Sequence, residues 1–275
     1  ESFLDSATVR ENVVSLARNI GYVPRSRSAA KANISFSFNT TSTSPTATLS
    51  AGLVCVGTIE NSNYVFSIPN DIVTTIVNGV ATFDNIDVFQ GTFLRKQFVV
   101  DGSLDQRFLL DNSFIDSSTI VVKVKGLSDT GTLGREYTLS NNILNVDSTS
   151  EIYLIQEARD ERYELLFGDG YFGKKLENGA VISATYIITD GKDGNGPTNF
   201  SYSGRVVDDL GNPIVPSNNI TITTNSAAAN GGDIESVDSI KYFAPRIYAS
   251  QYRAVTARDY EAIIQSIYPN TESVA

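Results

Sequence analysis

The sequence of 275 residues contains no histidine, and this absence removes whole classes of catalytic site. Without histidine there is no Ser-His-Asp or Cys-His arrangement and no common general base. The single cysteine, Cys55, excludes an intrachain disulfide and any metal site built from several cysteines. Its apolar neighbours, Leu53, Val54 and Val56, predict a buried and inert thiol. We therefore expect no enzymatic activity, no catalytic residue, no cofactor and no metal.

Basic residues are also few. Lys and Arg number 21 against 31 Asp and Glu, which gives a formal net charge of −10. This balance argues against a protein that binds the phosphate backbone of nucleic acids. No apolar run approaches the roughly 18–20 residues that a bilayer span requires. The expected partners therefore exclude nucleic acid and membrane, and no motif indicates a small-molecule substrate.

The first segment, residues 1–33, is predicted to be a helix followed by a connector. Thr8 and Glu11 have the spacing of a capping box, and Gly21 supplies a stop. The basic stretch 25–31 is interpreted as a solvated connector. The apolar residues recur at helical spacing: Val9, Val13, Leu16, Ala17 and Ile20.

Two β-rich segments follow, at 34–146 and 147–230. Residues 34–38 alternate between apolar and polar, as in a half-buried strand, and Asn78-Gly79 is a strong hairpin signal. Residues 40–48 are predicted to form a loop. In the second segment, 163–167 and 181–187 have the composition of strands.

Helical spacing returns in the last segment, 231–275. A short helix is expected from Ile234 and is predicted to stop at Pro245, and a final helix is expected between Thr256 and Pro269. The fold class is therefore α+β, with mostly antiparallel β-sheet domains and amphipathic helices at the N- and C-terminal ends.

Two glycine-rich stretches resemble ligand loops but lack features that such loops require. Residues 168–173 spell G-x-G-x-x-G, yet a second predicted strand follows instead of the helix that a dinucleotide site needs. A tight turn is favoured, with Gly168, Asp169, Gly170 and Gly173 as its structural residues. Residues 190–196 fit no register of a calcium loop and are predicted to be a flexible loop.

Two further functions remain as alternatives. The Ser-, Thr- and Asn-rich β composition and the tyrosines suit a β-sandwich carbohydrate-binding or adhesin module. A hydrolase that uses paired carboxylates needs no histidine, but the sequence pairs none of its acids.

Three motifs together resemble the baseplate J-like family, whose members are wedge proteins of contractile-tailed phages and related injection machines. The first is ELLFGDGYFGK at 164–174, followed by Asn178-Gly179 and Tyr186. The second is GGDIES at 231–236, followed by Ala244-Pro245 and by RAVTARDY at 253–260. The third is LARNIGYVPR at 16–25. The resemblance is greatest to the T-even type, in which this chain corresponds to the C-terminal part of a longer wedge subunit.

The resemblance implies a structural role in the virion. Family members contact other wedge proteins and a second copy of themselves, build the inner ring of the tail baseplate, and relay the signal for sheath contraction. The expected partners are therefore a homodimer or ring of this chain and other baseplate wedge proteins, assembled in the host cytoplasm. Tyr and Arg dominate interface hot spots, so we expect an interface on the C-terminal helices at Tyr248, Tyr252, Arg253 and Tyr260.

Overall fold

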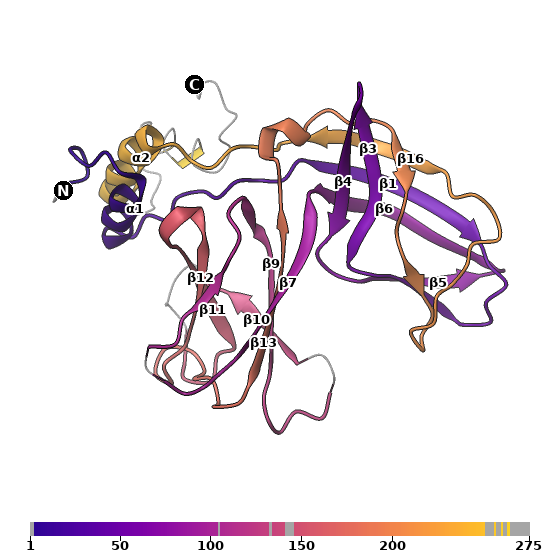
Figure 1. The fold of residues 1–275 in the computed structure, drawn as a ribbon, viewed down its shortest axis with the longest axis horizontal. Coiled ribbons are helices and arrows are strands. Elements are labelled where there is room, and N and C mark those ends of the chain that lie inside the picture. The colour runs from indigo at the N-terminus through magenta and orange to yellow at the C-terminus, as the bar shows by residue number, and fades with distance from the viewer. Residues whose placement is uncertain are drawn as a thin grey trace.

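Two β-sheets and a pair of helices make up the protein (Figure 1). The computed structural model describes residues 3–103, 105–131, 134–140, 146–250, 256, 260, 263 and 264. The helices α1 (Arg10–Asn19) and α2 (Val237–Ser250) lie side by side at one end of the molecule, although they come from opposite ends of the chain (Figure 1).

The first sheet has nine strands in the described part of the chain. Its main path runs β14-β3-β4-β6-β5-β2-β15, with β1 beside β6 and β16 beside β1. All of its strand pairs are antiparallel. The strands are β1 (Lys31–Asn39), β2 (Thr46–Leu49), β3 (Gly52–Ile59), β4 (Ser62–Ile68), β5 (Ile72–Val77), β6 (Val80–Gln90), β14 (Phe200–Tyr202), β15 (Val206–Val207) and β16 (Ile222–Ala229).

Aromatic rings fill the core of this sheet. Phe36 and Phe83 stack with their ring centroids 5.1 Å apart, and Phe66 meets Phe200 edge to face at 5.0 Å. The predicted hairpin is confirmed, because Asn78 and Gly79 join β5 to β6 with φ angles of 51° and 76°. Cys55 is buried in this core, as its apolar neighbours predict.

The second sheet has seven strands in the order β7-β13-β9-β10-β11-β12-β8. Its pairs are antiparallel except for β10 with β11, which is parallel. Its own core is built from aliphatic side chains and from tyrosines such as Tyr153 and Tyr186. The strands are β7 (Thr92–Val99), β8 (Phe108–Leu110), β9 (Ile115–Lys125), β10 (Arg135–Leu139), β11 (Ile152–Glu157), β12 (Tyr163–Phe167) and β13 (Val181–Ile188).

The mostly antiparallel β architecture is confirmed, and the helices are a minor part of it. The sheets draw their strands from both predicted β segments: 34–146 contributes to both sheets, and so does 147–230. Hydrophobic alternation identifies a strand but says little about its pairing partner. The segment boundaries 1–33, 34–146, 147–230 and 231–275 therefore stay a prediction of domain organisation.

Helix α2 corrects one prediction, because it continues through Pro245 to Ser250. Proline removes one helical hydrogen bond and usually ends or kinks a helix. Here the apolar stripe of Ile240, Ala244 and Ile247 is buried against α1 on both sides of the proline. This burial favours the continued helix. The last predicted helix, between Thr256 and Pro269, lies almost entirely outside the described residues.

Two local predictions were wrong, and a third was right only in part. The connector 25–31 is not solvated, because Ser26, Ala29 and Ala30 are buried and Ser28 pairs with Gly232. The predicted loop 40–48 is confirmed for residues 40–45, but residues 46–48 belong to strand β2, in which Ala47 and Leu49 are buried. The stretch 190–196 contains a short 3-10 helix, η2 (Gly191–Gly194), with both end glycines buried. In each case long-range packing orders a segment whose local composition favours a loop.

The start of α1 also differs by one residue from the prediction. Its N-cap is Val9, which makes no side-chain capping hydrogen bond. Val13 and Ala17 are buried as predicted, and the helix ends before Gly21, whose φ is 82°.

Candidate interaction surfaces

The turn at residues 168–173, which we call the FGDG turn, is closed by its own aspartate. One carboxylate oxygen of Asp169 accepts the backbone N–H of Tyr171 at 2.8 Å and that of Phe172 at 2.9 Å. The N–H of Gly170 donates to the carbonyl of Gly173 at 3.0 Å. The bonds from Phe172 and Tyr171 hold the pKa of Asp169 below its usual value, because they stabilise the charged form. The turn follows β12, and the next element along the described chain is strand β13 and not a helix.

Its glycines are required by geometry. Gly170 and Gly173 have φ angles of 95° and 86°, in the left-handed region that side chains with a Cβ rarely adopt. Gly168 has a different reason, since a Cβ there would overlap the backbone of Gly173. The close approach of residues 168 and 173 therefore depends on a missing side chain.

Neighbouring backbone fixes the turn to the second sheet. The N–H of Gly173 donates to the carbonyl of Asp147 at 2.9 Å, and that of Lys174 donates to the carbonyl of Ser150 at 2.8 Å. The ammonium group of Lys174 lies 2.8 Å from the carboxylate of Glu151. The turn is thus held at its base by two backbone bonds and one ion pair.

Two aromatic side chains project from this fixed turn. Tyr171 is 81% exposed and Phe172 is 56% exposed. Aromatic residues held by a rigid backbone bind a partner at a low cost in conformational entropy. Sequence reasoning missed both as surface residues, although an aromatic pair inside a glycine turn, outside any apolar period, is a usable signal.

The helical pair offers a second surface. Tyr242 and Tyr248 on α2 are exposed, and the guanidinium of Arg246 lies 3.5 Å from the centroid of the Tyr242 ring. Of the residues expected at an interface, Tyr248 is 61% exposed and Tyr260 is 52% exposed. Tyr252 and Arg253 lie outside the described residues, so the grouping of the four side chains stays a prediction.

The segment 231–236, which we call the Gly231–Ser236 junction, connects the helical pair to the two sheets. Glu235 is buried, and its carboxylate accepts three hydrogen bonds: from the Tyr22 hydroxyl at 2.7 Å, the Arg25 N–H at 2.9 Å and the Ser239 hydroxyl at 2.8 Å. Its carbonyl accepts a bond from the guanidinium of Arg10. One glutamate therefore joins the N-terminal connector to the start of α2.

The rest of the junction contacts the stretch 190–196. The side chain of Asn195 both accepts from the Gly231 N–H at 2.7 Å and donates to the Gly231 carbonyl at 3.0 Å. A Cβ on Gly231 would overlap the carbonyl oxygen of Gly191. Arg10 adds an ion pair with Glu157 of β11 at 2.8 Å. Sequence reasoning noted these motifs but assigned no contact to Glu235.

Comparison with known proteins bears on what these surfaces do. No family model matches the sequence. The chain is 27% identical over 304 aligned residues to a protein described as baseplate wedge protein gp6 of Enterobacteria phage T4. It resembles a phage baseplate wedge protein along nearly its whole length. The alignment covers 99% of this chain and 44% of the T4 protein, so the chain spans less than half the length of this relative.

A solved structure, the cryo-EM structure of the anti-feeding prophage baseplate, also matches. The match covers 97% of this chain and 48% of that chain, with 13% sequence identity and a TM-score of 0.32. This score is too low to establish a shared fold. The resemblance that the sequence motifs predict is confirmed by the T4 wedge protein alone.

The described residues include one cysteine, Cys55, and no histidine. Among them no group of three or more His, Cys, Asp or Glu side chains is placed to hold a metal ion. No helix in this part of the chain is long and apolar enough to cross a membrane. Burial raises the pKa of the Cys55 thiol to about 12, which opposes formation of a nucleophilic thiolate.

Proposed function

We propose that this chain is a non-enzymatic structural subunit of a phage tail baseplate wedge. The single observation that carries the proposal is the 27% identity to the T4 baseplate wedge protein over 99% of this chain. An alignment that spans both sheets and both helices supports a shared role better than a match to one motif. The structural role agrees with surfaces that present aromatic side chains on fixed backbone.

The proposed partners are a second copy of the chain and other wedge proteins. Together they form the inner baseplate ring, which relays the signal for sheath contraction. Two surfaces are candidates for these contacts: the FGDG turn with Tyr171 and Phe172, and the helical end with Tyr248, Tyr252, Arg253 and Tyr260. The exposure of Tyr171, Phe172, Tyr248 and Tyr260 supports this assignment, since exposed aromatics are typical anchors of protein interfaces.

The proposed location is the tail baseplate of the virion, after assembly in the host cytoplasm. The test is quantitative mass spectrometry of purified tail baseplates from the phage that encodes the chain. We expect the chain in a fixed ratio to the other wedge proteins. Baseplates that contain those proteins but lack this chain would contradict the proposal.

A further inference from the structure

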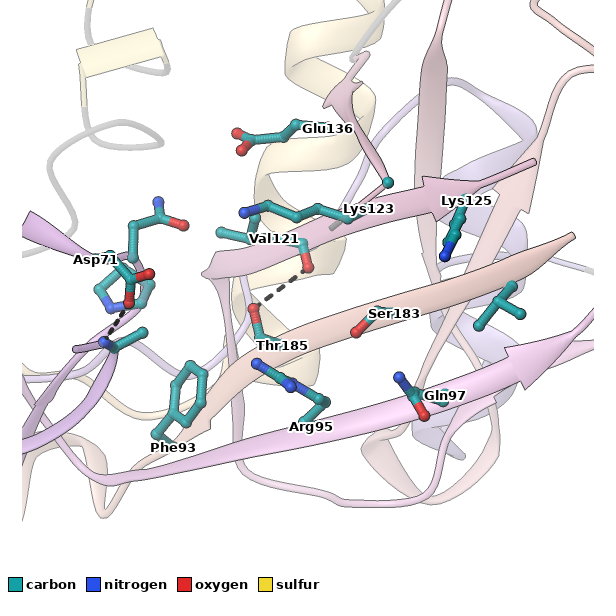
Figure 2. Close-up of a pocket in the computed structure, with 15 residues that line it drawn as sticks. Asp71, Phe93, Arg95, Gln97, Val121, Lys123, Lys125, Glu136, Ser183 and Thr185 are labelled. Atoms are coloured by element: carbon teal, nitrogen blue, oxygen red, sulfur yellow. Dashed lines mark hydrogen bonds between the residues drawn. The ribbon is translucent and has the colours of Figure 1, made fainter. Parts of the chain in front are cut away.

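A groove with a volume of 460 Å³ lies on the second sheet, on the face opposite its core. Strands β7, β13 and β9 form its floor (Figure 2). Side chains alternate along these strands, so Val122, Val124 and Ile182 point into the core while their neighbours line the groove. The opposite wall comes from two connections of the first sheet, with Ala51, Pro69, Asn70 and Asp71.

Three basic side chains lie along this floor. Thr185 lies opposite Arg95 of β7, and Ser183 lies opposite Lys123 of β9. Val181 lies opposite Lys125. Arg95, Lys123 and Lys125 therefore share one face, with the hydroxyl groups of Ser183 and Thr185 between the two basic strands (Figure 2).

The charge of these side chains is only partly offset within the described part of the chain, where Asp71 and Glu136 also line the groove and Glu136 lies opposite Lys123. Arg95, Lys123 and Lys125 make no ion pair there, whereas basic residues such as Arg10, Arg107 and Lys174 each pair with a glutamate. Lys123 and Lys125 are also half-buried. In a chain with a net charge of −10, a concave surface with three basic and two acidic side chains is a local reversal of sign. A carboxylate that entered the groove would complete the missing ion pairs.

We propose that this groove binds an extended acidic segment of a neighbouring protein. The inference rests on the proposed function, since the neighbour is then another protein of the baseplate. Charge complementarity favours a partner segment with a negative charge. The floor crosses three strands, about 10 Å at the usual strand spacing, which fits one extended chain. The hydroxyl of Ser183 can donate to a carboxylate or carbonyl of that chain, and the Thr185 hydroxyl, which itself donates to the Val121 carbonyl at 3.5 Å, can accept from an N–H.

Nucleic acid fits this groove less well. Phosphate-backbone binders commonly use about 6–10 cationic contacts, and this floor supplies three. Two carboxylates, Asp71 on the wall and Glu136 on β10, also line the groove and would repel a densely charged strand, whether its charges are phosphates or carboxylates. They leave room for a segment that carries both carboxylates and neutral hydrogen-bonding groups.

The test uses the full chain and a fluorescein-labelled peptide of about nine residues, close to 30 Å when extended, with alternating Glu and Ser. Fluorescence anisotropy measures its binding at about 50 mM salt, where ionic screening is weak. The double variant Lys123→Gln/Lys125→Gln removes two of the groove cations. Lys175→Gln/Arg205→Gln is the matched control, since it removes two exposed charges outside the groove. Circular dichroism checks that both variants are folded.

We expect saturable binding that weakens about tenfold in the groove variant and no more than about twofold in the control variant. An equal loss in both variants, or no saturable binding by the unmodified chain, would overturn the inference. Tighter binding of an oligothymidine with the same number of charges would also overturn it, in favour of nucleic acid. Should Lys123→Gln/Lys125→Gln fail to fold, Arg95→Gln replaces it, with Arg205→Gln alone as its control.

Failure of this inference can be separated from failure of the proposed function. If tail baseplates incorporate the groove variant to the same extent as the unmodified chain, the groove has no role in assembly. The proposed structural role would not be affected by that result. Absence of the unmodified chain from baseplates would contradict the proposed function itself, whatever the peptide assay shows.

Discussion

The FGDG turn and the Gly231–Ser236 junction are both glycine motifs, yet they are built in opposite ways. The FGDG turn is closed by bonds between residues at most three apart, in which Asp169 accepts from the N–H groups that follow it. The junction is closed by Glu235, whose partners Tyr22 and Arg25 lie more than 200 residues away in sequence. One motif is a local shape, and the other is a meeting point of distant segments.

This difference explains what each motif does for the molecule. The FGDG turn presents two aromatic side chains, and the bonds at its base reach only the segment 147–151 that leads into β11. The junction holds the helical pair against the sheets through one buried carboxylate and a set of close backbone contacts. Loss of the turn should therefore change one surface, whereas loss of the junction should change the position of a whole end of the molecule.

The largest effect is expected from Glu235→Ala. The substitution removes a buried carboxylate that accepts bonds from the Tyr22 hydroxyl and the Arg25 N–H, which should cost about 3 kcal/mol of unfolding free energy. Urea denaturation measures this loss. Relative to the unmodified chain, the hydrogen-exchange rate of the variant should increase more in α1 and α2 than in the sheets. Glu235→Gln, which keeps one acceptor oxygen, is the control and should lose less. A stability unchanged by Glu235→Ala would mean that the junction does not hold the helices.

The next largest effect is expected from alanine substitutions at one glycine of each motif. A Cβ at residue 168 or at residue 231 would overlap backbone atoms, so Gly168→Ala and Gly231→Ala should each destabilise by about 2 kcal/mol. Gly131→Ala is the control, since a Cβ there meets no atom within 4 Å. Hydrogen exchange should locate the loss at the second sheet for residue 168 and at the helical pair for residue 231. Full tolerance of Gly168→Ala would show that the turn is misassigned.

A smaller effect concerns the protonation of Asp169. Its pKa is lowered in the folded chain by the N–H bonds from Phe172 and Tyr171. Its contribution to stability is therefore fully present above the pKa of an unfolded aspartate, about 3.9, and is lost as the pH falls through the lower folded value. Two-dimensional NMR should show the amide signals of Tyr171 and Phe172 titrating below that pKa. Asp169→Asn should abolish the titration, and an unshifted pKa would contradict the hydrogen-bonded turn.

The smallest effect on stability is expected at the exposed aromatics. Tyr171→Ser/Phe172→Ser and Tyr248→Ala should each change the unfolding free energy by less than about 0.5 kcal/mol, because these side chains face solvent. Both should weaken incorporation into baseplates. Arg253→Ala/Tyr252→Ala tests the rest of the predicted helical interface in the same assay. Variants that fold and assemble normally would remove those surfaces from the proposal.

The same contrast, between local and long-range contacts, separates the features that the sequence predicts from those that it does not. The strands at 163–167 and 181–187 and the Asn78-Gly79 hairpin were predictable, because their signals are local. The buried connector at 25–31 was not, because its order comes from Glu235 and from pairing with Gly232. The continuation of α2 through Pro245 depends in the same way on packing against α1.

The two surfaces also differ in how far the sequence predicts them. The glycine requirement of the FGDG turn could be inferred from its spacing. The basic groove could not, because Arg95, Lys123 and Ser183 come from three strands whose register only the fold defines. A sequence with a strong acidic excess gives no sign that its few unpaired cations share one face.

Sedimentation velocity of the purified chain, alone and mixed with the other wedge proteins, tests the central claim most directly. We expect a self-associated species that persists on dilution, and a larger complex that forms with the wedge proteins at micromolar concentration. A chain that sediments as a monomer alone and stays separate from every wedge protein would contradict its role as a baseplate subunit.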